Sequence, residues 1–184
     1  MEEFVKQLKR PMGKHTVEEI AHTLVANLFP ANDLINLCFH KDAQVSFHAA
    51  WILEKMSTAH FDYFIESFPY FIKRLPETDN PSVKRHFGKI AVYSLHKIQK
   101  PIYKKSSQIF WGNKQEALVR AFFEWLIDSA LRPAAKVWCI EALDLLSSAY
   151  PWISEELPPT VQSLLTDAPP SLQVRGRRLL RKIN

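Results

Sequence analysis

Four segments of the sequence share one spacing of apolar or small residues, at positions i, i+4, i+7, i+8 and i+11. Side chains at this spacing lie on one face of an α-helix. The segments cover residues 45–56, 83–94, 135–146 and 172–183. Their starts lie 38, 52 and 37 residues apart, and intervals near 38 are typical of proteins built from repeated helical hairpins. The spacing therefore predicts an all-α chain.

Residues that begin helices stand before each of the four segments. They are Asp42, Asn80 with Pro81, Arg132 with Pro133, and Pro169 with Pro170. Another helical segment precedes each of these turns, at residues 32–40, 61–75, 114–130 and 160–165. One hairpin of this length cannot bury its apolar face alone, so we expect successive hairpins to share a continuous core.

The middle interval is about 15 residues longer than the others, and residues 99–113 contain the turn formers that explain it. We predict an inserted loop there. Before the first hairpin, Thr16 and Glu19 have the spacing of a capping box, which predicts a helix over residues 16–29. Gly88 and Gly176 lie inside predicted helices, where glycine costs about 1 kcal/mol relative to alanine, so each is expected to face a close neighbouring backbone.

A resemblance to HEAT-repeat proteins, and more loosely to armadillo-like proteins, lies in three stretches: DAQVSFHAAWIL at 42–53, NPSVKRHFGKIA at 80–91 and RPAAKVWCIEAL at 132–143. They look like the second helix of that repeat after its turn. The resemblance implies a right-handed α-α superhelix of about four HEAT-like hairpins plus an N-terminal helix. It covers roughly residues 31–184, and the chain length of 184 residues separately predicts a single domain over residues 1–184. It says little about activity, because that family is defined by packing positions.

The usual signatures of catalysis are missing from the sequence, which contains no P-loop, dinucleotide-binding glycine pattern, nucleophile elbow or zinc-protease motif. Four possible zinc ligands, Cys38, His40, His48 and His60, fall within 23 positions. However, Cys38 and His40 point to different faces of one helix, and a turn separates His40 from His48. We expect no metal, no cofactor and a non-catalytic role, while the sequence leaves the enzyme question open.

The net charge of +5 comes from 24 basic and 19 acidic residues, a mild excess for a nucleic-acid-binding domain. Cys38 and Cys139 stand in apolar helical contexts and are expected to be buried free thiols. The first ten residues lack a secretory signal, and no stretch approaches the roughly 18 consecutive apolar residues of a membrane span. The sequence therefore predicts a cytoplasmic protein without a membrane partner.

A candidate binding surface follows from the resemblance, because the second helices of such repeats line an inner, concave face. Positions i+3 and i+6 lie away from the apolar stripe and are the ones that can meet a partner. With the adjacent Arg85, they are His48, Trp51, His86, Lys89, Trp138, Glu141, Arg175 and Arg178. The row resembles a groove for an anionic or acidic-aromatic ligand. The alternative is that the tryptophans pack between repeats and the arginines solubilise a terminal repeat.

The predicted loop offers a second candidate surface. It combines cations with aromatic rings, at Tyr103, Lys104, Lys105 and Trp111. Loops on rigid scaffolds often carry binding residues. The alternative is that Phe110 and Trp111 anchor the loop to the core.

Two functions fit these features. The first is a HEAT-repeat scaffold that binds a protein or peptide through its concave face. The second is nucleic-acid binding through a basic groove, because the chain is also similar in architecture to the HEAT-like alkylpurine DNA glycosylases. That similarity would implicate Trp125, Asp128, Trp138 and Arg175, although the tryptophan and aspartate cluster of those enzymes cannot be aligned with this chain residue by residue.

Overall fold

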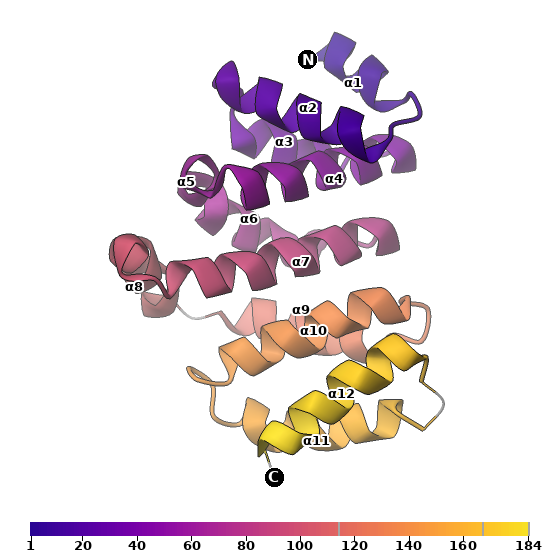
Figure 1. Cartoon of the computed structure of the whole chain (residues 1–184), viewed down its shortest axis with the longest axis vertical. Helices are drawn as coiled ribbons and strands as arrows, with labels where there is room; N and C mark the ends of the chain where they lie inside the picture. The colour runs from indigo at the N-terminus through magenta and orange to yellow at the C-terminus, as the bar shows by residue number, and fades with distance from the viewer. Residues whose placement is uncertain (114, 167, 184) are drawn as a thin grey trace. The chain divides into compact units, whose positions relative to one another are not determined.

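The computed structural model describes residues 1–113, 115–166 and 168–183, with side chains described up to residue 181. All regular elements within these ranges are helices (Figure 1), so the predicted all-α class is confirmed. The chain divides into two compact units, Met1–Ile90 and Ala91–Asn184. The single domain over residues 1–184 stays a prediction.

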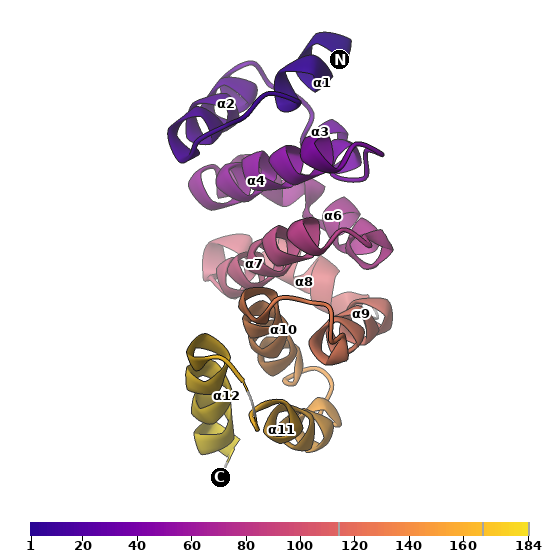
Figure 2. The same cartoon turned by 90° about the vertical axis from the view of Figure 1, so that its right-hand side faces the viewer.

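The first unit contains three helical hairpins. Its helices are α1 (Glu2–Leu8), α2 (Lys14–Ala26), α3 (Ala31–Leu37), α4 (Ala43–Ala59), α5 (Phe61–Phe64), η1 (Ile65–Ser67), α6 (Phe68–Arg74), η2 (Leu75–Glu77) and the greater part of α7 (Pro81–Ile98). Within this unit α2, α4 and α7 form one layer, and α3 and α6 lie in the other (Figure 2). We call α2, α4 and α7 the second helices of their hairpins.

The start of α4 shows how the sequence begins a second helix. Asp42 is the N-cap residue, and its Oδ1 accepts hydrogen bonds from the backbone N–H groups of Gln44 and Val45 at 3.0 and 3.3 Å. The bond from Val45 is the main cause that lowers the pKa of the Asp42 carboxyl. From this cap the predicted apolar stripe runs along α4 fully buried, at Val45, Ala49, Ile52, Leu53 and Met56.

Aromatic rings fill the space between the two layers of the first unit. Phe87 of α7 is fully buried, and its ring centroid lies 4.9 Å from that of Phe71 on α6 and 5.8 Å from that of Phe39. Phe64 and Phe68 continue the cluster from the 61–75 segment. Most of the aromatic residues in that segment therefore belong to the core.

The second unit begins within α7 at Ala91. It continues through η3 (Pro101–Tyr103), α8 (Lys104–Gly112), α9 (Glu116–Ile127), α10 (Pro133–Leu146), α11 (Ile153–Leu164) and α12 (Pro170–Ile183). The second helix α10 packs against α9, α11 and α12. Its predicted stripe is buried from Ala135 to Leu146, and α12 buries Leu172, Gly176 and Leu179. The side chain of Ile183, the last position of the fourth stripe, lies outside the described residues.

Gly176 is closely packed, although not against a backbone. A Cβ atom at this position would lie 2.8 Å from Leu165 Cδ2 and 3.0 Å from Val161 Cγ1. Val161 lies on α11, and Leu165 is the residue directly after that helix. The predicted close backbone was therefore wrong for Gly176, whose nearest neighbours are two apolar side chains. A glycine here lets α12 lie close to the apolar face of α11.

Several predicted boundaries were wrong. Residues 99–113, predicted as a loop, contain η3 and α8, with Pro101 at a helix start. The helix α2 begins at Lys14 after Gly13, so Thr16 lies inside its first turn and caps nothing. The helix α11 begins at Ile153 and includes Pro158 and Pro159, where the sequence predicted a start near residue 160.

Some of the remaining findings concern helices that were not predicted or that bear on membrane insertion. Residues 2–8 form α1, which the sequence did not predict, and α1 packs against α4. The predicted start at Lys114 lies outside the described residues. Among the helices that the structure describes, none is both long and apolar enough to cross a membrane.

Candidate functional site

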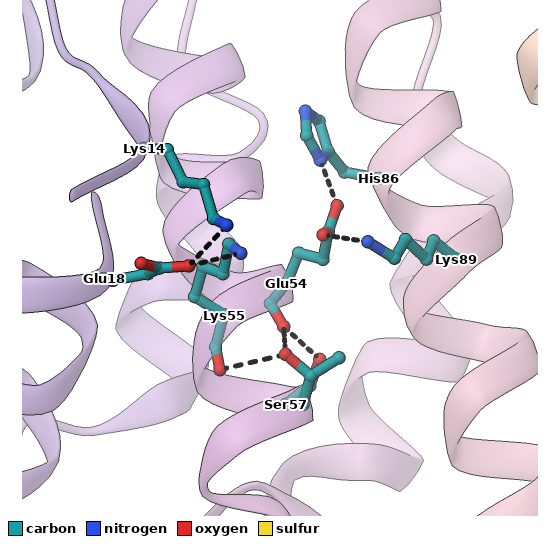
Figure 3. A network of polar contacts seen from close by, with 8 residues as sticks. Lys14, Glu18, Glu54, Lys55, Ser57, His86 and Lys89 are labelled. Atoms are coloured by element: carbon teal, nitrogen blue, oxygen red, sulfur yellow. Dashed lines mark hydrogen bonds and ion pairs between the residues drawn. The ribbon is translucent and has the colours of Figure 1, made fainter. Parts of the chain in front are cut away.

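A buried carboxylate connects two second helices in the first unit (Figure 3). Glu54 of α4 is 6% exposed, and its Oε2 lies 2.6 Å from Nδ1 of His86 on α7. Its Oε1 accepts a hydrogen bond of 2.5 Å from Nζ of Lys89, one turn further along α7. Burial raises the pKa of Glu54, but the hydrogen bonds from His86 and Lys89 outweigh it and lower the pKa below its ordinary value. Glu54 is therefore ionised at neutral pH.

Aromatic rings surround this ion pair. The half-buried Trp51 stacks on His86, with ring centroids 6.4 Å apart and planes 24° apart, and Phe47 contacts both rings. Because Glu54 holds the imidazole of His86, this stack has a fixed geometry. Arg85, which precedes His86 on α7, is exposed.

His48 has a structural role in this unit. Its side chain is buried, and Nδ1 lies 2.7 Å from the backbone carbonyl oxygen of Leu8. Leu8 is the last residue of α1, so His48 links α1 to α4. A partner could not reach this ring without disturbing that contact.

The second unit also contains an ion pair between two of its helices. Arg175 of α12 forms an ion pair with Glu141 of α10. Both side chains line a cleft of about 500 Å³, together with His96, Ile140, Asp144, Leu145, Arg178 and Leu179. Arg178 is exposed at this cleft, whereas Arg175 is half-buried. The cleft is open to a ligand and has two arginines and two carboxylates on its walls.

The other predicted residues are distributed over the second unit. Trp138 is half-buried on α10. Tyr103 and Trp111 are half-buried, and Lys104 and Lys105 are exposed, on η3 and α8. Phe110 is 5% exposed, and its ring meets that of Trp111 edge to face at 4.8 Å. Phe110 therefore anchors this segment, as the alternative interpretation predicted.

Three of the residues suggested by the glycosylase resemblance have contacts that the structure describes. Trp125 is 4% exposed and packs edge to face against Phe122 on the same helix. Arg175 is engaged by Glu141. Asp128 Oδ1 accepts a hydrogen bond from the backbone N–H of Ala130 after the end of α9. Trp125 is therefore a core residue.

The histidine and cysteine cluster of the sequence also separates. Cys38 and Cys139 are buried free thiols. His40 Nδ1 accepts a hydrogen bond from the backbone N–H of Asp42, and His60 instead meets His22 of α2. Among the described residues, no group of three or more potential ligands is placed to hold a metal ion.

Sequence reasoning missed Glu54 and Asp144, and one signal could have found both. Glu54 stands nine positions after Val45, and Asp144 stands nine positions after Ala135. Position i+9 continues the row of i+3 and i+6 by one further step along the same helical face. In the first unit Glu54, at position i+9 of α4, contacts His86 and Lys89, which stand at positions i+3 and i+6 of α7.

The helical hairpins, buried stripes and polar contacts between second helices define a helical-repeat protein. The sequence model of the HEAT repeat domain matches residues 4–102. The chain belongs to the HEAT repeat family. No curated protein and no solved structure gives a significant match to it.

Proposed function

We propose that this protein is a non-catalytic HEAT-repeat scaffold that binds an acidic segment of a partner protein through its second helices. HEAT repeats are typically protein-interaction scaffolds. The observation that carries the proposal is the cleft of about 500 Å³ in the second unit, where exposed Arg178 lies beside Arg175, held by Glu141. A side chain that is already held in place loses less conformational entropy when a ligand binds.

Charge supports an acidic ligand in this cleft. The carboxylate of Glu141 is engaged by Arg175, and the wall also carries the exposed Arg178 and the half-buried Asp144. Exposed Arg177 and Arg181 follow on α12. A guanidinium can bind a carboxylate through two parallel hydrogen bonds, which favours aspartate or glutamate side chains as the bound groups.

The first unit offers a different kind of contact. Trp51 presents a half-buried ring that is fixed by its stack on His86. The charge of Lys89 is paired with Glu54, so this face offers shape and aromatic area more than charge. Further contacts in the second unit are proposed for Tyr103, Lys104, Lys105 and Trp111.

We also propose a cytoplasmic location, since Cys38 and Cys139 are free thiols.

The proposal predicts that Arg178→Glu weakens binding of acidic peptides at least tenfold, because a repulsive charge replaces an attractive one. A random peptide library displayed on phage is panned against the full chain. The enriched peptides are then synthesised, and their affinities are measured by fluorescence anisotropy. We expect enrichment of aspartate and glutamate.

The matched control is Arg120→Glu, which reverses an exposed charge on α9 of the same unit. It should change the affinity by less than about twofold. Equal weakening by the two variants would reject the cleft as the binding site. Enriched peptides without acidic residues would reject the proposed ligand chemistry.

One observation favours nucleic-acid binding as a second candidate function. Arg177, Arg178 and Arg181 line a hollow of about 470 Å³ along α12 together with Val174. If these arginines bind the phosphate groups of the DNA backbone, the affinity for duplex DNA should fall about tenfold or more between 50 and 200 mM salt. Filter binding across that range measures it. An affinity for DNA that is undetectable at 50 mM salt would remove this alternative.

A further inference from the structure

Two histidines from distant parts of the sequence meet in the first unit. His60 Nε2 lies 2.7 Å from His22 Nδ1, and the two ring planes stand at 89° to each other. His22 belongs to α2, and His60 is the residue that ends α4. The contact joins neighbouring second helices, and neither ring belongs to the surfaces proposed above for peptide binding.

The pair lies at the wall of an open cavity. The cavity has a volume of about 310 Å³ and is lined by Glu18, Ala21, His22, Lys55, Thr58, Ala59 and His60. Both side chains can thus be approached by a small solute from this cavity. His22 is exposed and His60 is half-buried.

The chemistry of the pair fits a transition-metal ion. Neutral imidazole is a common ligand of zinc, copper and nickel. Burial and the adjacent His22 lower the pKa of His60, which favours the neutral ring. Zinc binds imidazole nitrogen at about 2.0–2.1 Å, so two nitrogens on a tetrahedral ion stand about 3.3 Å apart. The two nitrogens would have to separate by a little more than half an ångström, and both rings would have to turn so that their lone pairs point at the ion.

The backbone of His60 and the charged side chains near the pair bear on that movement. His60 stands between α4 and α5 with a φ of −129° and a ψ of 54°, so its own backbone is not helical. Glu18 stands one turn before His22 on α2 and lines the same cavity. Its Oε1 is 2.8 Å from Lys55 Nζ and 3.9 Å from Lys14 Nζ, so the nearby cations are partly balanced.

We propose that His22 and His60 form a two-imidazole binding site for a divalent transition-metal ion, with water as the remaining ligands. In this site the ion replaces the hydrogen bond between Nδ1 of His22 and Nε2 of His60. The two-ligand set agrees with the finding that the described residues offer no cluster of three or more potential ligands. A bound ion would fix α2 to the end of α4.

The test uses the full chain without an affinity tag, because a histidine tag would itself bind metal. Zinc is titrated by calorimetry in a buffer that does not chelate it, near pH 7.5. We expect one ion per chain, a rise of a few degrees in Tm, and shifted imidazole nitrogen resonances for His22 and His60 in NMR spectra. Affinity should fall at least tenfold near pH 5.5, because protons compete with metal ions for imidazole ligands.

Single variants assign the ligands. His22→Ala and His60→Ala should each weaken zinc binding at least tenfold, whereas His15→Ala, at an exposed position of the same helix, should leave it unchanged. Circular dichroism checks that each variant is folded. The proposal is overturned if the wild-type chain binds no zinc at about 1 mM, or if His22→Ala binds it as the wild type does. Either result would leave the pair as a hydrogen bond only.

Discussion

Phe87→Ala is expected to lower the free energy of unfolding by about 3–5 kcal/mol, the largest effect of a single substitution considered for the first unit. The ring of Phe87 is fully buried between Phe71 and Phe39, so its removal leaves a cavity that the surrounding helices cannot fill. Urea unfolding followed by far-ultraviolet circular dichroism measures the change.

The control for this prediction is Phe87→Leu, which keeps most of the apolar volume and should cost clearly less. A matched truncation at a less buried aromatic position, Phe123→Ala, should also cost less. If Phe87→Ala lowered stability no more than Phe123→Ala, at a half-buried position of the second unit, the buried aromatic cluster around Phe87 would not make the expected contribution to stability.

Glu54→Gln is expected to lower the free energy of unfolding by about 2 kcal/mol at neutral pH. The change keeps the shape of the side chain but removes the charge that His86 and Lys89 surround. We set the value below that of a fully buried ion pair because the Lys89 side chain is 40% exposed to solvent. Glu66→Gln, at an exposed position of η1, is the control and should change stability by less than about 0.5 kcal/mol.

The same interaction has a defined pH dependence. The pKa of Glu54 is lower in the folded chain than its ordinary value. Its contribution to stability is therefore complete above the unfolded-state pKa of about 4.3, and it is lost as the pH falls through the folded-state pKa. In urea titrations the stability difference between wild type and Glu54→Gln should accordingly shrink as the pH falls below about 4.3. A constant difference down to about pH 3 would contradict the assignment.

The repeat positions could be predicted from the sequence because packing requires them. Val45, Val83, Ala135 and Leu172 are all buried at equivalent positions of second helices, as their spacing predicted. Helix boundaries were less predictable, because prolines and serines were interpreted as loop residues. In the 99–113 segment Pro101 instead begins a helical turn, where a missing N–H costs nothing.

The candidate site was only partly predictable. The periodicity of a single helix indicates which residues lie on the same face of that helix, but it does not indicate which side chains of a neighbouring helix they contact. His48 was predicted to face a partner, yet it binds the carbonyl oxygen of Leu8 on a helix that the sequence did not reveal. His86 and Lys89 were predicted as surface residues, yet both engage Glu54. The contact between His22 and His60 joins residues 38 positions apart, which no local pattern shows.

The position of Glu54 on α4 limits how this repeat can change during evolution. One residue inserted between Asp42 and Glu54 would rotate the carboxylate by about 100° around the helix axis and move it away from His86 and Lys89. The same insertion would rotate the cap at Asp42 relative to the apolar stripe. We therefore expect homologous repeats to vary here by substitution, while the length of the segment between the cap and the carboxylate is conserved.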